Sequence, residues 1–167
     1  MATSSGCSPC DSLRFRNACG KFPTGVTVTT LIDNAGAPRG ISINSFTSVS
    51  LEPPLILVCV NCRSQIIPTM TIGTCFGINV LSSDQQFLAA KFSCHWENRF
   101  ASVRWRPGKT GVPLLDGVAA VLECRVVRRE IVGDHVVVFG LVLTATLTEE
   151  PPLTFANRAY GSFRAVG

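Results

Sequence analysis

Two long stretches rich in Val and Leu, residues 118–128 and 135–147, lie close together in the second half of the chain. Their β-branched residues favour strands, and residues 130–134, which end in Gly-Asp, supply the turn between them. Shorter stretches of the same kind predict strands at residues 26–32, 40–46, 55–60 and 75–81, and one more within 153–163. Residues 33–38 are predicted as a turn, and the Glu-Pro-Pro of residues 52–54 interrupts the ladder.

Helical patterns are few and short. Residues 13–19 are predicted as a helix that Asp11 or Ser12 caps and that Gly20 ends. A second helix is predicted from a cap at Ser82 or Ser83 to about residue 92, residues 66–72 are predicted to hold a helical turn, and residues 98–117 are predicted to be irregular. Because strands and helices do not alternate in a βαβ pattern, the predicted fold is mainly β, a closed antiparallel barrel with a few peripheral helices.

The composition predicts one ordered domain. A chain of 167 residues can bury a real core, and 46% hydrophobic against 16% charged residues excludes disorder. Residues 1–11 are predicted as a flexible lead and residues 12–167 as the domain. The longest apolar runs, 55–60 and 136–143, are far shorter than the roughly 20 residues of a membrane-spanning helix. Basic residues are scattered and the net charge is only +4, so we expect neither a membrane nor a nucleic-acid partner.

The eight cysteines are interpreted as reduced thiols of a cytoplasmic protein, because the first residues show no signal-peptide pattern. Cys7 and Cys10 form one C-x-x-C pair, and Cys59 and Cys62 form another, a spacing that also occurs in zinc sites. Residues three apart on a strand face opposite sides, however, and the gap between the pairs is unlike that of a zinc ribbon. The sequence therefore favours core or surface thiols over a metal site.

Several common catalytic patterns are missing from the sequence. Neither G-x-G-x-x-G nor G-x-x-x-x-G-K-[ST] is present, which disfavours a Rossmann or P-loop enzyme. No G-x-S-x-G accompanies the two histidines, His95 and His135, and two histidines in unrelated contexts fall short of a hydrolytic metal site. His95, beside Cys94 and Trp96, is interpreted as structural.

Residues 44–48, Asn-Ser-Phe-Thr-Ser, are the least ordinary segment. Four hydrogen-bonding side chains and one aromatic ring lie between two apolar strands, where unpaired polar groups would be costly. One reading is a polar, planar ligand that satisfies these groups. The other is a bulged strand end whose Ser and Thr residues bond their own backbone. The residues alone do not separate the two readings.

The polar segment of residues 44–48 belongs to one of three sequence blocks that follow one another in a fixed order. The first is residues 22–28, Phe-Pro-Thr-Gly-Val-Thr-Val, and the second is residues 40–54, from Gly-Ile-Ser-Ile-Asn-Ser to Leu-Glu-Pro-Pro. The third is Gly133-Asp134-His135, which runs directly into a Val-rich strand. Together they resemble the short-chain flavin reductases, the small partners of two-component flavin monooxygenases. The resemblance implies an FMN-binding split barrel, a Greek-key-like antiparallel barrel with peripheral short helices.

The resemblance also implies roles for particular residues. Flavin contacts are expected at Ile43, Asn44, Ser45, Phe46, Thr47, Ser48, Val49 and Ser50, at Cys62, Arg63 and Ser64 after the following strand, and at Lys91 and Phe92 at the end of the second helix. Arg63 suits a phosphate, although a solvated turn explains the same residues. Gly133, Asp134 and His135 are expected near the nicotinamide, with His135 as the orienting candidate and Asp134 shaping the turn, and Tyr160 is expected near the same pocket.

The implied activity is NAD(P)H:flavin oxidoreduction. NADH or NADPH would reduce FMN or FAD without a side chain acting as acid or base, and the reduced flavin would pass to a separate monooxygenase. The resemblance further implies a homodimer with flavin near the subunit interface, which suits the apolar composition. The alternatives are a reductase of another acceptor, such as corrin cobalt or a ferric complex, and an electron carrier that holds FMN tightly.

Overall fold

The computed structural model describes residues 8–94 and 98–166 of the chain. In chain order, its elements are α1 (Ser12–Cys19), β1 (Thr24–Gly25), β2 (Thr27–Ile32), β3 (Pro38–Ile43), β4 (Thr47–Leu51), β5 (Pro54–Asn61), β6 (Cys75–Val80), α2 (Gln86–Ser93), β7 (Trp105–Pro107), β8 (Pro113–Leu115), β9 (Ala120–Val132), β10 (His135–Leu147), β11 (Leu153–Ala156) and β12 (Ala159–Ser162).

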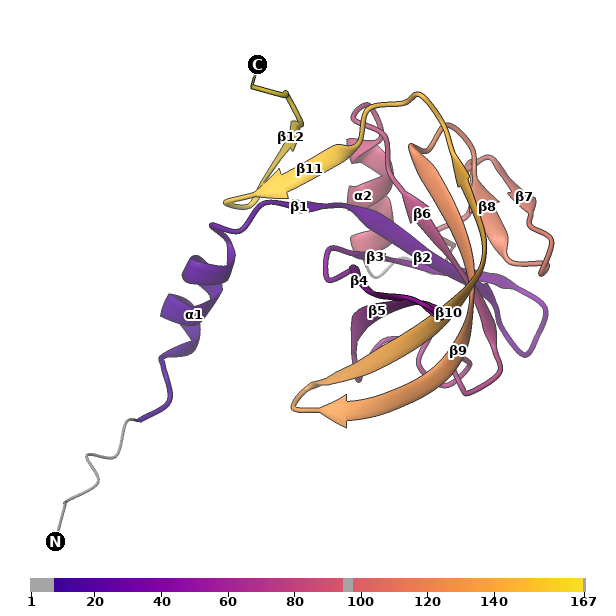
Figure 1. Cartoon of the computed structure of the whole chain (residues 1–167), viewed down its shortest axis with the longest axis horizontal. Coiled ribbons are helices and arrows are strands. Elements are labelled where there is room, and N and C mark those ends of the chain that lie inside the picture. The colour runs from indigo at the N-terminus through magenta and orange to yellow at the C-terminus, as the bar shows by residue number, and fades with distance from the viewer. Residues whose placement is uncertain (1–7, 95–97, 167) are drawn as a thin grey trace, which may run out of the picture.

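Seven strands form the barrel in the order β3-β2-β6-β9-β10-β5-β4, and their pairings are all antiparallel. Because β3 and β4 stand at the two ends of this order, the sheet curls into a barrel that is open between them (Figure 1). The mainly β fold is confirmed. The barrel is split, as the family resemblance implied, and not closed.

The long hairpin is confirmed with a shorter connection than predicted. β9 runs on to Val132, which pairs with His135 at the start of β10, so only Gly133 and Asp134 separate the strands. Gly133 has a φ of +61°, a conformation that glycine adopts without strain. Placing residues 130–132 in the connection was wrong, because Ile131 pairs in the ladder although its side chain is exposed.

Two apolar clusters form the core. One fills the barrel and includes Phe76, Ile78 and Val138, all fully buried. At Gly140 a Cβ would stand 2.5 Å from the Phe76 ring, so the absence of a side chain there makes room for this ring. The other cluster lies between the barrel and α2 and includes Phe92, which is fully buried.

A buried polar contact fastens β8 to the barrel. Asn79, fully buried on β6, donates from Nδ2 to the Val28 carbonyl (3.0 Å) and to Thr30 Oγ1 (3.1 Å). Its Oδ1 accepts from the Leu115 N–H at 2.7 Å, and Thr30 Oγ1 donates to the Pro113 carbonyl at 2.5 Å. One amide therefore joins β2, β6 and β8.

Helix α1 projects away from the barrel, next to a small sheet of β1, β11 and β12 (Figure 1). Asp11 caps it as predicted, accepting from the N–H groups of Leu13 (3.3 Å) and Arg14 (3.0 Å). The helix has no buried residue, and Leu13 and Phe15 are 59% and 62% exposed. Short helices are normally stabilised by packing of their apolar side chains. Helix α1, with eight residues, lacks this packing and leaves apolar surface exposed.

Several predicted boundaries were wrong. The strand placed at 40–46 spans Pro38–Ile43, because Ser45 turns away to bond β5, and residues 47–51 form a further strand, β4. Residues 52–54 do not break the ladder, since Leu51 pairs with Pro54 across a tight turn. The region 98–117 contains β7 and β8, and the tail contains two strands instead of one. These short strands carry too little pattern to be seen locally.

The cap of α2 was also placed wrongly. The residue before the helix is Gln85, which makes no capping bond from its side chain. Ser82 is instead hydrogen-bonded to the Gly117 carbonyl (2.7 Å) and to Asp84 (2.6 Å). Its hydroxyl therefore joins the start of this segment to the loop before β9.

Candidate functional site

The polar segment after β3 is divided between structural and exposed groups. The Ser45 hydroxyl donates to the Cys59 carbonyl and accepts from the Cys59 N–H, both at 3.0 Å, and so fixes the segment between β3 and β4 against β5. Ile43 is buried, and Phe46 packs against the barrel core. Exposed side chains are those of Asn44, Thr47, Ser48 and Val49, while Ser50 is half-buried. The exposed polar groups are therefore the ones available to a ligand.

The end of β5 and the start of β10 bring two predicted groups together. His135 pairs with Asn61, and the Cys62 N–H donates to the Asp134 carbonyl at 2.9 Å. Asn61 Oδ1 accepts from the Arg63 N–H at 2.9 Å, which shapes the turn that carries Arg63. Ser64 closes that turn by donating its N–H to the Asn61 carbonyl at 2.9 Å.

Asp134 and His135 form a close pair. His135 Nδ1 lies 2.7 Å from Asp134 Oδ1, with the side chains 41% and 87% exposed respectively. The hydrogen bond from His135 is the largest cause that holds the pKa of Asp134 below its ordinary value. The nearby charge of Arg63 acts in the same direction on this pKa.

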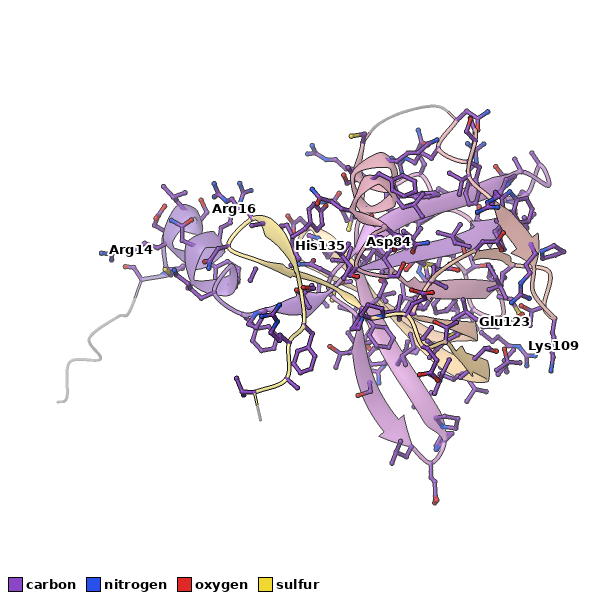
Figure 2. The ribbon with its side chains drawn as sticks, turned by 90° about the horizontal axis from the view of Figure 1, so that it is seen from above. Arg14, Arg16, Asp84, Lys109, Glu123 and His135 are labelled. Carbon is purple, nitrogen blue, oxygen red and sulfur yellow. The ribbon has the colours of Figure 1, made fainter. Side chains whose placement is uncertain are left out.

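A cavity of about 1140 Å³ lies between α1, the small sheet and the barrel. Asn44, Asp134 and His135 line its barrel side, and Figure 2 shows His135 on the side of the barrel that faces α1. The other walls come from α1, the segment after it and the β11–β12 turn, which contribute Phe15, Arg16, Asn17, Lys21, Phe22, Phe155, Asn157 and Arg158. Three basic side chains and several aromatic rings thus surround a space that includes His135.

The basic wall was not predicted. Arg16 follows from no motif, and Lys21 directly precedes the block of residues 22–28 without belonging to it. Arg158 Nη2 lies 3.5 Å from Asn17 Oδ1, so the β11–β12 turn meets α1 across 141 positions of sequence. Arg158 stands two residues before Tyr160, and this proximity was the one signal that pointed to it. Tyr160 itself packs against Phe155, with ring centroids 5.1 Å apart and the ring planes tilted by 55°.

A second cavity, of about 450 Å³, lies at the other end of β3. Arg39, Gly40, Gln65 and Arg99 are among its lining residues. Arg99 donates to the Gly40 carbonyl at 2.7 Å, and burial lowers the pKa of its guanidinium, which nevertheless stays charged. Arg39 is held by Asp33 at 2.6 Å. Gly40 lines this cavity and Asn44 lines the large one. The two residues are four positions apart, which corresponds to about 13 Å of extended backbone.

Lys91 and Phe92 lie on the α2 side of β3 and not in the large cavity. The Phe92 ring is fully buried, 5.1 Å from the Phe100 ring in an edge-to-face contact, and a Cβ on Gly40 would lie 2.7 Å from it. Lys91 Nζ donates to the Ala101 carbonyl. The structure therefore gives both side chains contacts within the protein, next to the loop that lines the second cavity.

Far from these cavities, Glu123 is a buried carboxylate with a structural environment. It accepts from the Lys109 N–H (3.0 Å), from the Thr110 N–H and hydroxyl (2.6 Å each) and from the Thr144 hydroxyl (3.1 Å). Desolvation raises its pKa, but the hydrogen bonds together outweigh desolvation and leave the pKa below its ordinary value. Figure 2 shows Glu123 beside Lys109, on the side of the barrel opposite α1.

Metal and membrane features complete the description. Within residues 8–94 and 98–166, no group of three or more His, Cys, Asp or Glu side chains is arranged to hold a metal ion. The seven cysteines in these ranges are free thiols; Cys7 and His95 lie outside the described residues. None of the described helices has both the length and the apolar character needed to cross a membrane.

Comparison with known families gives this architecture a name. A family model described as a flavin reductase like domain matches residues 19–164. The chain belongs to the flavin reductase family.

Individual relatives agree with this assignment. The chain is 41% identical to the NADH-dependent FMN reductase SmoA of Agrobacterium fabrum over 153 residues, which is 92% of this chain and 87% of that protein. It is 38% identical to the reductase subunit HsaB of a flavin-dependent monooxygenase of Rhodococcus jostii over 151 residues, 90% of this chain and 77% of that protein.

A solved structure and two longer relatives complete the comparison. The NADH:FAD oxidoreductase SgcE6 of Streptomyces globisporus, solved with NAD and FAD fragments, superposes with a TM-score of 0.86 at 37% identity, covering 92% of this chain and 93% of that one. The chain spans only 50% of a flavin reductase of Rhizobium meliloti and 65% of the stachydrine N-demethylase reductase subunit from the same organism.

Proposed function

We propose that this chain is an NAD(P)H:flavin oxidoreductase that reduces FMN or FAD with NADH or NADPH. The observation that carries the proposal is the cavity of about 1140 Å³ in which Asn44 and His135 face three basic side chains. A nicotinamide dinucleotide is an elongated anion with a planar ring at each end and a diphosphate between them. This cavity offers positive charge for the diphosphate and a histidine for the nicotinamide ring. The named activities of SmoA and SgcE6 support the same conclusion.

Residues on β3, just after it and at the start of β4 fit a flavin. Exposed Asn44, Thr47 and Ser48 offer donors and acceptors to the polar edge of the ring, beside the opening between β3 and β4. Arg39 and Arg99 at the other end of β3 supply positive charge for the phosphate. The separation of about 13 Å suits a ligand that lies along the strand. Among the residues that the sequence predicts to contact flavin, Phe92 contributes least, because its ring is packed in the core.

The residues around His135 fit a nicotinamide dinucleotide. Arg16, Lys21 and Arg158 are the cations of the α1 side, and they suit a diphosphate. His135 lies across the cavity on the barrel side, where it orients the nicotinamide ring. When both cofactors are bound, the nicotinamide supplies a hydride to the flavin, and the chain's own groups bind, orient and exclude water.

A homodimer is part of the proposal. Leu13, Phe15 and Phe22 are 59%, 62% and 74% exposed on and just after α1, although apolar side chains of this size normally lie buried. A second copy that covers α1 would remove this surface from water and would narrow the open cavity. Light scattering on the purified protein tests this directly, and Phe15→Ser is expected to weaken the dimer.

Reduced flavin is proposed to pass to a separate flavin-dependent monooxygenase in the cytoplasm. HsaB is named as the reductase subunit of such an enzyme, which supports this type of partner. The free thiols of the described residues suit a reducing compartment.

The test is NADH oxidation with and without added FMN or FAD. A reductase turns over free flavin many times, whereas a tight FMN carrier accepts electrons once, and a reductase of corrin cobalt or ferric complexes needs its own acceptor. Ser48→Leu is expected to weaken flavin binding about tenfold, because it replaces an exposed hydroxyl by a bulky group. His135→Ala is expected to lower kcat/KM for NADH about five- to thirtyfold at nearly constant flavin affinity.

Particular outcomes with Ser48→Leu, His135→Ala and the unmodified protein would contradict the proposal. An unchanged flavin dissociation constant in Ser48→Leu would contradict the flavin placement. Wild-type flavin reduction kinetics in His135→Ala would contradict the nicotinamide placement. Absence of both flavin binding and NADH oxidation in the unmodified protein would overturn the proposed function as a whole.

A further inference from the structure

The proton position on His135 follows from its contact with Asp134. A carboxylate has oxygen acceptors and no hydrogen to donate. The distance of 2.7 Å from His135 Nδ1 to Asp134 Oδ1 is therefore a hydrogen bond in which Nδ1–H is the donor. Because the pKa of Asp134 is held below its ordinary value, first by this same hydrogen bond, the carboxyl group is ionised near neutral pH.

In the neutral form of the ring, this contact also determines the role of the other nitrogen. A neutral imidazole carries one N–H, and a carboxylate that engages Nδ1–H leaves Nε2 as an acceptor. We propose that Asp134 is a positioning residue of the reductase: it holds neutral His135 in the Nδ1–H tautomer, so that Nε2 accepts a hydrogen bond from the carboxamide NH₂ of the nicotinamide. This inference rests on the proposed function.

The backbone around the pair is well placed for such a role. His135 pairs with Val132 on one side and Asn61 on the other, and the Asp134 carbonyl accepts from the Cys62 N–H at 2.9 Å. The turn is therefore held by two strands. The Asp134 side chain is 87% exposed, and so exposed a polar contact contributes little to stability. Substitution at Asp134 should consequently change the histidine without unfolding the protein.

Removal of Asp134 should have two opposite effects on the binding of NADH. Among the described residues that line the large cavity, Asp134 is the one carboxylate, opposite Arg16, Lys21 and Arg158. Its removal makes the cavity more positive, which by charge alone favours the negatively charged dinucleotide. Loss of the proper tautomer acts in the other direction, because Nε2–H would then meet the carboxamide NH₂ as donor against donor. A weaker interaction with NADH after removal of Asp134 therefore points to positioning.

The first measurement is the tautomer itself. Nitrogen NMR of the folded protein with labelled histidine distinguishes protonated from unprotonated ring nitrogens, and the chain has only two histidines. The His135→Ala variant identifies the His135 signals. Above the pH at which the ring is protonated, we expect Nδ1 to be the protonated nitrogen in the unmodified protein and Nε2–H to become populated in Asp134→Ala. A wild-type spectrum with Nε2–H, or one that Asp134→Ala leaves unchanged, would overturn the inference.

The second measurement is the kinetic effect. Asp134→Ala is expected to raise KM for NADH about fivefold, the effect of one hydrogen bond, with the flavin dissociation constant unchanged. Asp116→Asn, which removes an exposed carboxylate at a different cavity, serves as the charge control and should leave KM unchanged. An unchanged or lower KM in Asp134→Ala would overturn the positioning role. The absence of NADH oxidation by the unmodified protein would instead overturn the proposed function, and the NMR result would still report on Asp134.

Discussion

Replacing Asn79 by Ala is expected to destabilise the protein by about 3–5 kcal/mol, because the change leaves buried backbone groups without partners. The side chain is fully buried and makes three hydrogen bonds, of 2.7, 3.0 and 3.1 Å, to Leu115, Val28 and Thr30. Leu115 is itself 3% exposed, so water does not readily replace the lost acceptor of its N–H.

The magnitude follows from adding these losses. Each hydrogen bond contributes about 1 kcal/mol, and a buried donor left unpaired costs about 1–3 kcal/mol. Removing the amide also leaves a small cavity beside β8, which adds to the loss. A domain of this size is stable by about 5–15 kcal/mol, so the variant should fold but lie near the lower limit.

The assay is equilibrium unfolding in urea at neutral pH, followed by far-UV circular dichroism and by tryptophan fluorescence. Trp105, one of the two tryptophans of the chain, packs on β7 against Phe100 with ring centroids 5.9 Å apart, so its share of the emission reports on the β7–β8 hairpin that Asn79 anchors. Asn34→Ala, in the exposed turn between β2 and β3, is the matched control and should change the unfolding free energy by about 0.5 kcal/mol or less. A loss below about 1 kcal/mol for Asn79→Ala would refute the reasoning.

Two further predictions concern buried polar groups. Glu123→Gln should cost about 2–3 kcal/mol at neutral pH, because an amide NH₂ would face a donor of Thr110. Because the pKa of Glu123 is lowered in the folded protein, its contribution is present above the ordinary glutamate pKa and is lost as pH falls through the folded value. Urea titrations of both proteins at several pH values should show this difference shrinking in acid, and a constant difference would contradict it. Thr29 Oγ1 is buried without a hydrogen-bond partner in the described part of the chain, so Thr29→Val should raise stability by about 0.5–1 kcal/mol and the melting temperature by about 1–4 °C. A clear decrease would show that the hydroxyl is satisfied.

The candidate site was only partly readable from the sequence. The block Gly133-Asp134-His135 marks the turn at which β10 begins, and the polar segment of residues 44–48 marks the end of β3. The basic wall of the large cavity carries no motif, because Arg16 and Arg158 reach it from opposite ends of the chain. Phe92 has the residue type of a ring-stacking side chain, and only its packing against Phe100 places it in the core.

The sequence by itself determined the features that depend on neighbouring residues. Val-rich stretches specify β9 and β10 because β-branched side chains suit extended backbone, and Asp11 specifies the start of α1 because its carboxylate reaches the first free N–H groups. Gly133 permits the turn through its positive φ. Each of these effects acts over a few residues, so the local pattern contains the information.

Only the tertiary structure decided which distant groups meet. Ser45 reads as a ligand-binding hydroxyl, yet in the fold it bonds Cys59 and so fixes the path of the chain between β3 and β4. Asn79 reads as an ordinary polar residue of a strand, yet it satisfies a donor of Leu115, 36 positions away. Whether a polar side chain is structural or free depends on its burial and its partners in the folded barrel, and sequence neighbours carry no record of either.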